Sequence, residues 1–346
     1  MKHTKRLFSI AMLLAVMCAC EGPEREKIQK TWISKYSIDS FEEDNEKTGS
    51  PSLSIVAKLG ETQLTLKSLS SNASDGGNDR IVKDYTVQDR QLLVGKENLF
   101  LQALSEDSLV VSVQSNSTEK FVFEALQKHR QGSREGEFSR LLTSERFALQ
   151  SDSIQIEFRD DGTYLSDDLF FGAGGRQLWG VDQFDGELFL VLNEDLLTTS
   201  FHILDFSSSG IRTKVYGRQN KEVMFKVLDG SKGFARSSIL GEWEREGHSI
   251  PPPPVEEGAI FYQTELVNIS TTALQRCEAF RCDTTAWEWN RGNDILIFTN
   301  PAKMAGQRQW NILSLDEERL LIERKRKFAP SSGQRIETVA FKRKAN

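Results

Sequence analysis

The sequence predicts an all-β protein built from three tandem, small antiparallel β-barrel units. One spacing of apolar residues recurs three times, the segments around it alternate with a period of two, and helical periodicity is nearly absent. The chain has 346 residues, enough for two or three domains, and its hydrophobic share of 38% and charged share of 27% are those of a folded protein. Its formal charge of −6 argues against a nucleic-acid binder, which must neutralise phosphates.

The recurring pattern is clearest at residues 310–320, which predict a strand, a four-residue polar turn and the start of the next strand. The same spacings occur at residues 99–109 and 201–211, so the repeat period is 102 and then 109 residues. A second apolar cluster follows each copy and closes the unit. The apolar positions of the three copies are Leu99, Leu101, Leu104 and Leu109; Phe201, Ile203, Phe206 and Ile211; and Trp310, Ile312, Leu315 and Leu320.

Each unit also opens on an aromatic residue. Trp32 and Trp243 both lie 67 residues before their copy of the pattern, and Phe147 takes that place in the shorter middle unit. A sheet with one apolar face curls to cover that face, so we expect each opening aromatic to lie inside its unit with the aromatic of the closing cluster. The closing aromatics are Phe123, Phe225 and Phe341.

Turn residues between alternating runs predict hairpins. Residues 154–158 alternate between apolar and polar side chains, and Asp161-Gly162 then precedes another strand. Asp185-Gly186 repeats this arrangement, in which glycine supplies a positive φ at no steric cost. Only Glu119–Arg130 is compatible with a short helix. Each unit therefore offers about eight short strands, and closing them into a barrel removes the exposed sheet edges.

Two motifs resemble the lipocalins. Gly241-Glu242-Trp243, at the start of an all-β unit, is similar to the Gly-x-Trp opening of that family. The hairpin at residues 158–164 and the strand at residues 310–315 resemble the lipocalin-like domains of Bacteroidota lipoproteins. The first unit departs from the pattern with Lys30-Thr31 in place of Gly-x, and the middle unit lacks the tryptophan. Because these motifs are structural, the resemblance implies three lipocalin-like barrels and implies no activity.

The amino terminus resembles that of a bacterial lipoprotein. Residues 1–19 combine a basic leader with an apolar run too short to span a bilayer, as in a secretory signal peptide. A small residue followed by Cys20 is similar to a lipobox, in which Cys20 is acylated, for example with palmitate; an ordinary signal peptide is the alternative. Residues 20–27 form an acidic tether. This resemblance implies a lipid anchor in the outer membrane, at either its periplasmic or its cell-surface face.

Polar, glycine-containing stretches set the predicted domain boundaries. Residues 128–137 separate the first two units, and residues 229–238 separate the last two. The predicted lipocalin-like units are therefore residues 28–127, 138–228 and 239–346. Both linkers are short, so we expect neighbouring units to touch.

Cys277 and Cys282 lie in the third unit. On one extended strand their Cα atoms would be about 16 Å apart, beyond the limit of roughly 7 Å for a disulfide. A bridge therefore requires residues 278–281 to turn. We expect either this disulfide, since exported chains usually oxidise paired thiols, or two buried thiols. No Cys/His spacing typical of a metal site is present, and no cofactor is expected.

Two further segments are candidate contacts for a ligand or partner. Trp287 and Trp289 alternate along one strand, so their indoles share a face. They either form a stacking platform, for instance for a sugar ring, or fill a hydrophobic interior. A four-proline run favours an extended rod that either docks onto a partner or stiffens a loop across a barrel mouth. Its members are Pro251, Pro252, Pro253 and Pro254.

Two carboxylate pairs and one basic run have simple structural explanations. Asp160-Asp161 and Asp167-Asp168 fit the acid pair of a glycoside hydrolase, but both lie at turns, where aspartate caps its own backbone. Residues 319–344 hold nine basic and two acidic side chains. We expect this run to be a solvent-facing strand surface, with contact to an anionic lipid or partner as the alternative.

These observations predict a non-catalytic envelope lipoprotein that acts as a binding or scaffold module. It would hold a small apolar or glycan ligand, or dock onto an outer-membrane protein assembly, and it would meet the membrane through its lipid anchor. The alternatives are an enzyme of sugar or lipid metabolism and an inert structural spacer. A carrier requires a cavity of a few hundred Å³, roughly 300–1,000, whereas an enzyme requires titratable groups with shifted pKa values that converge in one cleft.

Overall fold

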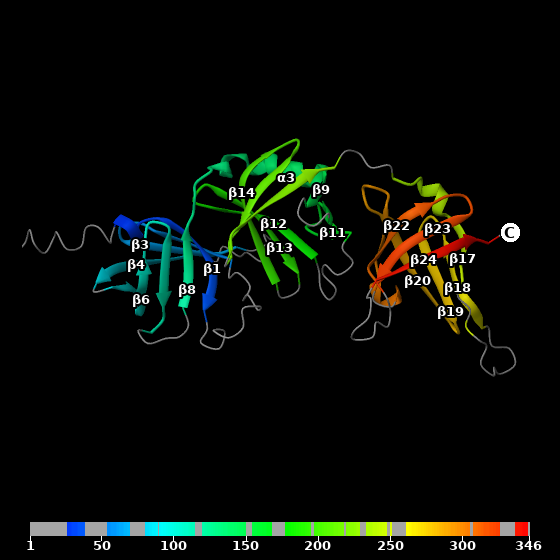
Figure 1. Ribbon diagram of the computed structural model, residues 1–346, viewed down its shortest axis with the longest axis horizontal. Coiled ribbons are helices and arrows are strands. Elements are labelled where there is room, and N and C mark those ends of the chain that lie inside the picture. Colours follow the sequence, from blue (N-terminus) through cyan, green and yellow to red (C-terminus); the bar gives the residue numbers. More distant parts are fainter. Residues whose placement is uncertain are drawn as a thin grey trace, which may run out of the picture. The chain divides into compact units, whose positions relative to one another are not determined.

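The computed structural model describes the chain in fourteen segments. It is an all-β protein with three eight-stranded antiparallel sheets (Figure 1), so the predicted lipocalin-like barrel architecture is confirmed. No helix in these segments is both long and apolar enough to cross a membrane. The described residues are 26–38, 54–69, 80–88, 90–114, 120–149, 154–167, 177–194, 197–217, 219–228, 233–247, 250, 261–304, 307–325 and 336–344.

The N-terminal barrel consists of eight strands that pair in chain order, and its first strand closes on its last. Side chains alternate between the two faces, as Leu92 and Val94 show by pointing inward from one strand. The strands are β1 (Thr31–Ile38), β2 (Ile55–Leu59), β3 (Gln63–Ser68), β4 (Arg80–Gln88), β5 (Gln91–Val94), β6 (Glu97–Leu104), β7 (Ser108–Ser112) and β8 (Lys120–Ala125).

The middle sheet has the same cyclic strand order but is not closed. Its order is β11-β10-β9-β16-β15-β14-β13-β12, so its third and fourth strands form the two edges. The strands are β9 (Arg146–Leu149), β10 (Ile154–Phe158), β11 (Tyr164–Ser166), β12 (Gln177–Phe184), β13 (Glu187–Glu194), β14 (Leu197–Ser207), β15 (Gly210–Val215) and β16 (Lys221–Val227). Both predicted hairpin turns form: Gly162 has φ 79°, and Asp185 and Gly186 both have positive φ.

The C-terminal barrel again pairs its eight strands in chain order and closes the first on the last. Its strands are β17 (Gly241–Arg245), β18 (Tyr262–Ile269), β19 (Ala273–Ala279), β20 (Arg281–Trp289), β21 (Ile295–Phe298), β22 (Gln309–Leu315), β23 (Arg319–Lys325) and β24 (Ile336–Arg343).

The short helix expected at Glu119–Arg130 is wrong, because β8 occupies Lys120–Ala125 and residues 126–130 are not helical. A helix forms instead in and beyond the predicted linker, as α3 (Glu135–Ser144). Phe138 and Leu142 lie four residues apart on it, so both fall on one face, and both are fully buried. The described segments also contain the 3₁₀ helices η2 (Gln131–Arg134), η3 (Arg236–Ile239) and η4 (Pro301–Met304).

All three copies of the recurring pattern fold into the same bulged hairpin. The pairing register shifts at one equivalent position in each copy, which leaves one extra residue on the first strand. A β-bulge increases the local twist of a sheet and so helps it to curl. The extra residues are Gln102, Leu204 and Leu313.

The turn of each bulged hairpin begins with a residue whose side-chain oxygen accepts a backbone N–H. Ser105 Oγ accepts from Ser108 at 3.0 Å, and Ser207 Oγ accepts from Ser209 at 3.3 Å. Asp316 Oδ1 accepts from Arg319 at 2.6 Å. This bond satisfies an N–H that the tight turn would leave unpaired. The repeat is therefore one of hydrogen-bond chemistry as well as of apolar spacing.

The opening tryptophans occupy equivalent places in the two barrels. Trp32 and Trp243 are fully buried, and each donates its Nε1–H to the carbonyl four residues earlier, that of Ile28 at 2.9 Å and of Ile239 at 2.8 Å. Phe147, which has no N–H, is also fully buried. The closing aromatics Phe225 and Phe341 are fully buried, whereas Phe123 packs half-buried against its core.

The Gly-x-Trp opening has a steric cause in the C-terminal barrel. Gly241 has φ 133°, and a Cβ there would lie 2.7 Å from Arg343 Nη1. The Arg343 guanidinium lies 4.2 Å from the centroid of the Trp243 ring and donates to the carbonyls of Ser238 and Leu240. In the N-terminal barrel the residue paired with the opening tryptophan is alanine instead of arginine, which agrees with the absence of a glycine there.

Contacts between Cα atoms divide the chain into two compact units. The first comprises Met1–Leu141 and Arg176–Phe225, and the second comprises Leu142–Gly175 and Lys226–Asn346. In the first, the outer face of the N-terminal barrel packs against β12–β13 through an apolar cluster flanked by ion pairs of Asp185 with Lys58 and Lys128. The cluster contains Ile33, Val56, Leu69, Leu126, Phe184, Phe189, Val191 and Tyr216.

In the second compact unit, β10 and β11 lie against the C-terminal barrel. Gln309 Nε2 and Asn311 Nδ2 donate to the carbonyls of Ser166 and Asp167, both at 2.7 Å. Leu165 packs with Ile295 and Ile297 of the barrel. Both bonds join a side chain of the barrel to a backbone carbonyl at the end of β11, so they fix the position of β11 on this barrel.

The indole hydrogen bonds give a first prediction. Trp243→Phe should destabilise the second compact unit by about 1–3 kcal/mol, because it leaves the buried Ile239 carbonyl without its donor. Urea unfolding of the full chain measures this change. Trp32→Phe is the matched control, since it should shift the transition of the first compact unit alone. A Trp243→Phe variant as stable as the parent would contradict this role of the indole.

Candidate functional site

A pocket of about 550 Å³ lies in the second compact unit, between the turn after β10 and the end of β20. Nine of its ten lining residues are polar or charged, and the tenth is a tryptophan. Its volume is within the range of small-molecule sites. The lining residues are Glu157, Arg159, Asp160, Asp161, Arg236, Glu288, Trp289, Asn290, Arg291 and Asn293.

The loop after β20 is held rigidly at the pocket wall. Asn290 is buried, and its Oδ1 accepts the backbone N–H groups of Asp294 at 3.0 Å and Ile295 at 2.9 Å. Arg146 of β9 forms an ion pair with Asp294 at 2.9 Å. Asn293 has φ 51°, a conformation that asparagine tolerates better than most residues. The loop is therefore preorganised by side-chain bonds, as a binding site requires.

Glu157 is the most deeply buried acid of the pocket. Its side chain extends from β10, the residue is 5% exposed, and Oε2 accepts the backbone N–H of Arg291 at 2.8 Å. Burial raises the pKa of Glu157, and this effect outweighs the hydrogen bond from Arg291 and the nearby guanidinium charges. The carboxyl group therefore binds a proton more readily than an exposed glutamate does.

The three arginines that line the pocket are already bonded to protein atoms. Arg159 forms an ion pair with Glu288 at 2.5 Å. Arg291 Nη2 donates to the Phe158 carbonyl at 2.7 Å, and Arg236 Nη2 donates to the Thr271 carbonyl at 3.1 Å. The positive charges are thus held in place and partly compensated.

The two aspartates of the turn differ in their bonding. Asp161 Oδ1 accepts from the backbone N–H of Thr163 at 2.9 Å and from its hydroxyl at 2.5 Å, so the expected capping role is confirmed. Burial raises the pKa of Asp161, but the bonds from Thr163 outweigh it and lower the pKa overall. Asp160 is exposed and has no hydrogen-bond or ion-pair partner within the described segments. It is an acceptor available to a ligand.

The two tryptophans of β20 have different surroundings. Trp287 is 4% exposed and belongs to the barrel core, and its Nε1 donates to the Ser270 carbonyl at 2.9 Å. Trp289 packs half-buried against the same core, with its ring centroid 5.9 Å from that of Trp287. Its Nε1 is buried and has no acceptor in the described part of the chain. Of this pair, only Trp289 lines the pocket.

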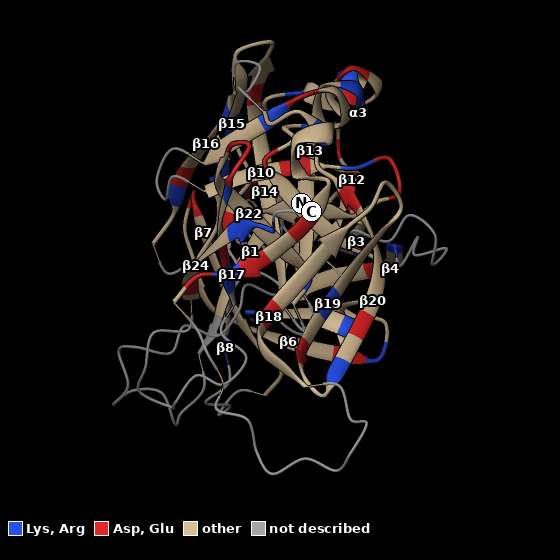
Figure 2. Ribbon diagram, turned by 90° about the vertical axis from the view of Figure 1, so that its right-hand side faces the viewer, with Lys and Arg blue, Asp and Glu red and all other residues tan. Residues whose placement is uncertain are grey.

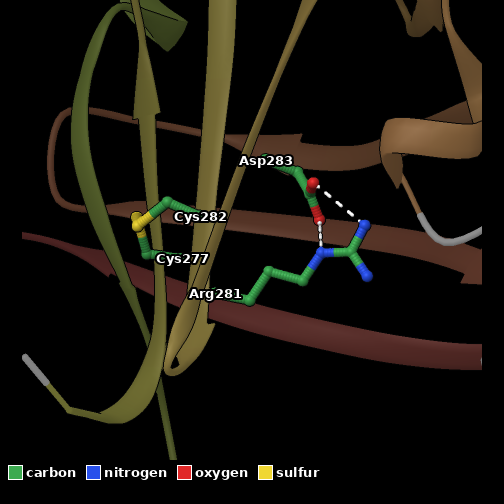
Figure 3. The surroundings of a disulfide bond; sticks show 4 residues. All are labelled: Cys277, Arg281, Cys282 and Asp283. Carbon is green, nitrogen blue, oxygen red and sulfur yellow. Dashed lines mark hydrogen bonds and ion pairs between the residues drawn. A yellow bond between two sulfur atoms is a disulfide. The ribbon is translucent and has the colours of Figure 1, made fainter.

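The other sequence candidates lie elsewhere. Cys277 and Cys282 form a disulfide across β19 and β20, where they are direct register partners with a Cα–Cα distance of 4.1 Å (Figure 3). The chain turns between them at Ala279, whose φ is 53°. Cys20 and the proline run, with Pro251 at its start, lie outside the described residues, as does Asp168.

A buried ion-pair network occupies one end of the C-terminal barrel interior. Arg324 is 1% exposed and binds both oxygens of the fully buried Glu265, at 2.5 and 2.7 Å. Arg276 adds a bond to Glu265 at 2.5 Å. Burial opposes ionisation of Glu265, but these guanidinium groups lower its pKa to about 2. Arg324 belongs to the basic run that was expected to face solvent, and for this residue the expectation is wrong.

A buried histidine lies in the first compact unit. His202 Nε2 lies 3.0 Å from Glu187 Oε2, and Nδ1 lies 3.1 Å from the Tyr216 hydroxyl. Glu187 is also fully buried and accepts the backbone N–H groups of His129 and Arg130 at 2.8 and 2.9 Å. Burial lowers the pKa of His202, although Glu187 opposes that shift. The neutral ring therefore bridges a tyrosine and a carboxylate.

Within the described segments, no group of three His, Cys, Asp or Glu side chains could hold a metal ion. The local sequence did not indicate Glu157, Arg236 or Arg291 as site residues. Glu157 occupies a polar position of an alternating strand, and the backbone N–H that it accepts comes from Arg291, 134 residues later in the sequence. No family model matches the chain, and no curated protein matches it either.

The Glu265 network gives a second prediction. Glu265→Leu should destabilise the second compact unit by about 3–5 kcal/mol, because it removes the carboxylate that binds two nitrogens of the buried Arg324 and leaves Glu337 as its remaining described ion-pair partner. In the double variant Glu265→Leu/Arg324→Met much of this loss should be recovered. Urea unfolding of the full chain measures both. If the double variant were less stable than the single one, the penalty would not come from an unpaired charge.

The histidine gives a third prediction, on pH. A lowered folded-state pKa means that the unfolded chain binds the proton more readily, so this stability is complete above about pH 6.5 and decreases as the pH falls. Glu187, Tyr216, His129 and Lys214 are the titratable groups that act on the ring. The urea concentration at the unfolding midpoint of the first compact unit should therefore decrease as the pH is lowered from about 7 to about 5. If the midpoint of the His202→Gln variant depended on pH as steeply as that of the parent, His202 would not be the group responsible.

Proposed function

We propose that this protein is a non-catalytic, lipid-anchored envelope lipoprotein that acts as a binding module, and that its ligand occupies the pocket at Glu157 and Trp289. The observation that carries this proposal is a cavity of about 550 Å³ with a rigid wall, an aromatic ring and an uncommitted carboxylate at Asp160. A cavity with a few convergent polar groups is the usual form of a small-molecule site.

The filled barrel cores support a ligand site outside them. The C-terminal barrel has an apolar cluster that includes Trp243, Trp310 and Leu274, all fully buried, and Glu265 and Arg324 form a buried ion pair in the same barrel. The N-terminal barrel has a similar cluster around Trp32. An apolar ligand would have to displace this packing, which contributes about 25 cal/mol per Å² of apolar surface removed from water.

The envelope location rests on the leader and Cys20, with the disulfide as support. Cys277 and Cys282 are bonded, and disulfides persist mainly in oxidising compartments such as the bacterial periplasm or cell surface. Fatty acylation at Cys20 would retain the protein at the membrane without a spanning helix.

A second candidate function is glycoside hydrolysis in the same pocket. Its specific support is that the pKa of Glu157 is raised while that of Asp161 is lowered, as in an acid and base pair. The bonds of both groups argue for a structural role instead, since Glu157 holds the Arg291 backbone and Asp161 caps Thr163. A scaffold role would require no pocket at all.

The test uses the purified full-length lipoprotein in detergent and a dialysable extract of bacterial envelope. The extract should give a saturable change in tryptophan fluorescence. Asp160→Asn should weaken this binding roughly tenfold or more, because a hydrogen bond to a charged group contributes about 1.5–3 kcal/mol. Asp107→Asn, at an exposed turn of the N-terminal barrel, is the matched control and should bind as the parent does.

Three results would contradict the proposal. Equal binding by Asp160→Asn would place the ligand elsewhere, and a stoichiometric envelope protein captured equally by both variants would favour the scaffold role. Conversion of a bound compound, lost in Glu157→Gln, would establish an enzyme and overturn the non-catalytic assignment.

A further inference from the structure

We infer that the ligand of this pocket is an uncharged, polyhydroxylated molecule, that is, a neutral glycan. This inference rests on the proposed function, because it specifies the chemical class that the same site would take. It follows from which polar groups of the pocket are already bonded and which are available.

The charges of the pocket nearly cancel. Three arginines face four acids, and the ion pair of Arg159 with Glu288 is direct. Figure 2 shows that acidic and basic positions both occur along β19 and β20. A multiply charged ligand would find no excess of opposite charge, and it would have to break existing pairs at a desolvation cost.

An anion is further disfavoured by the bonding of the guanidinium groups. Arg291 and Arg236 donate to the carbonyls of Phe158 and Thr271, so neither presents its full fork of donors. Strong recognition of a carboxylate or phosphate uses two parallel donors of one arginine. The available charge-bearing atoms are instead carboxylate oxygens, chiefly those of Asp160, and these accept hydrogen bonds from hydroxyl groups.

An apolar ligand or a metal ion fits no better. The only aromatic or aliphatic side chain that lines the pocket is Trp289, and the remaining lining is polar. The described acids, Glu157 and Asp161 included, do not come together as a group of three metal ligands. Polar lining around a single ring suits a ligand that is polar at its rim and has one less polar face.

A sugar ring has that distribution of polarity. Its C–H face can lie on the indole of Trp289, which is amphipathic and loses little entropy when it binds. Its hydroxyl groups both donate and accept, so they can serve Asp160 and the arginine N–H groups at the same time. Neither interaction requires net charge on the ligand.

In the test, the same dialysable envelope extract is treated in two ways and is then added to the full-length lipoprotein. Periodate cleaves the carbon–carbon bond of vicinal diols and oxidises both carbons to carbonyls while iodate forms, so it destroys a polyhydroxylated ligand. Anion- and cation-exchange resins remove charged compounds. We expect the fluorescence change to disappear after periodate and to persist in the flow-through of both resins. In that neutral fraction Asp160→Asn should bind roughly tenfold more weakly, and Asp107→Asn should bind unchanged.

The outcomes separate the two proposals. Binding that survives periodate, or that is retained on either resin, overturns the neutral-glycan inference but leaves a ligand at the pocket. An untreated extract that gives no saturable signal, or one that Asp160→Asn does not weaken, overturns the proposed function and this inference together.

Trp289→Phe tests the ring without removing the core packing, and its affinity should fall less than that of Trp289→Leu. Equal affinities in these two variants would exclude stacking and would overturn the glycan assignment.

Discussion

The bulged hairpin that recurs in each sheet is the constraint on which the rest of the structure depends. An eight-stranded antiparallel sheet with one apolar face is stable only if it curls over that face. Gln102, Leu204 and Leu313 supply the extra residue that increases the twist at the same point of each sheet. The turns that follow are capped by a serine or aspartate oxygen, which accepts a backbone N–H of the same turn.

Curling has a consequence for function, because these small barrels bury large side chains in their interiors. Trp243, Trp310 and Phe341 pack in the core of the C-terminal barrel, and the buried charged groups of Glu265 and Arg324 bind each other. A site for another molecule is therefore best sought where elements meet outside the cores. The contact of β10 with this barrel is such a place, and a cavity of about 550 Å³ is formed there.

Much of the fold could be predicted from the sequence, because its determinants are local and repeated. Alternation, Asp-Gly turns and the opening tryptophans fix strand faces and hairpins within short stretches. The helix at Glu135–Ser144 was missed because its polar, glycine-containing start has the composition of a linker, while only Phe138 and Leu142 mark a buried face. The basic run at residues 319–344 was misinterpreted for a similar reason. Arg324 follows Leu320 and Ile322 at alternate positions, so its side chain points inward as theirs do, but its charge favoured a prediction of exposure to solvent.

The candidate site was only partly predictable. Trp289 and Asp161 could be identified as candidates from the sequence, but the role of Glu157 depends on its bond with Arg291 and on a pocket wall that lies more than a hundred positions later in the chain. The separation of Trp287 from Trp289, one in the core and one at the pocket, also depends on where the barrel ends. Alternation alone places both on one face and cannot distinguish them.

The most direct test of this account is hydrogen–deuterium exchange of the full-length protein with and without the envelope extract, followed by mass spectrometry of its peptides. The ligand should slow exchange in the peptides that contain Glu157–Asp161 and Glu288–Asn293, while exchange in the barrel strands β22 and β23 should be unchanged. Slower exchange confined to β22 and β23, with none at the pocket, would place the ligand inside the barrel and contradict the account.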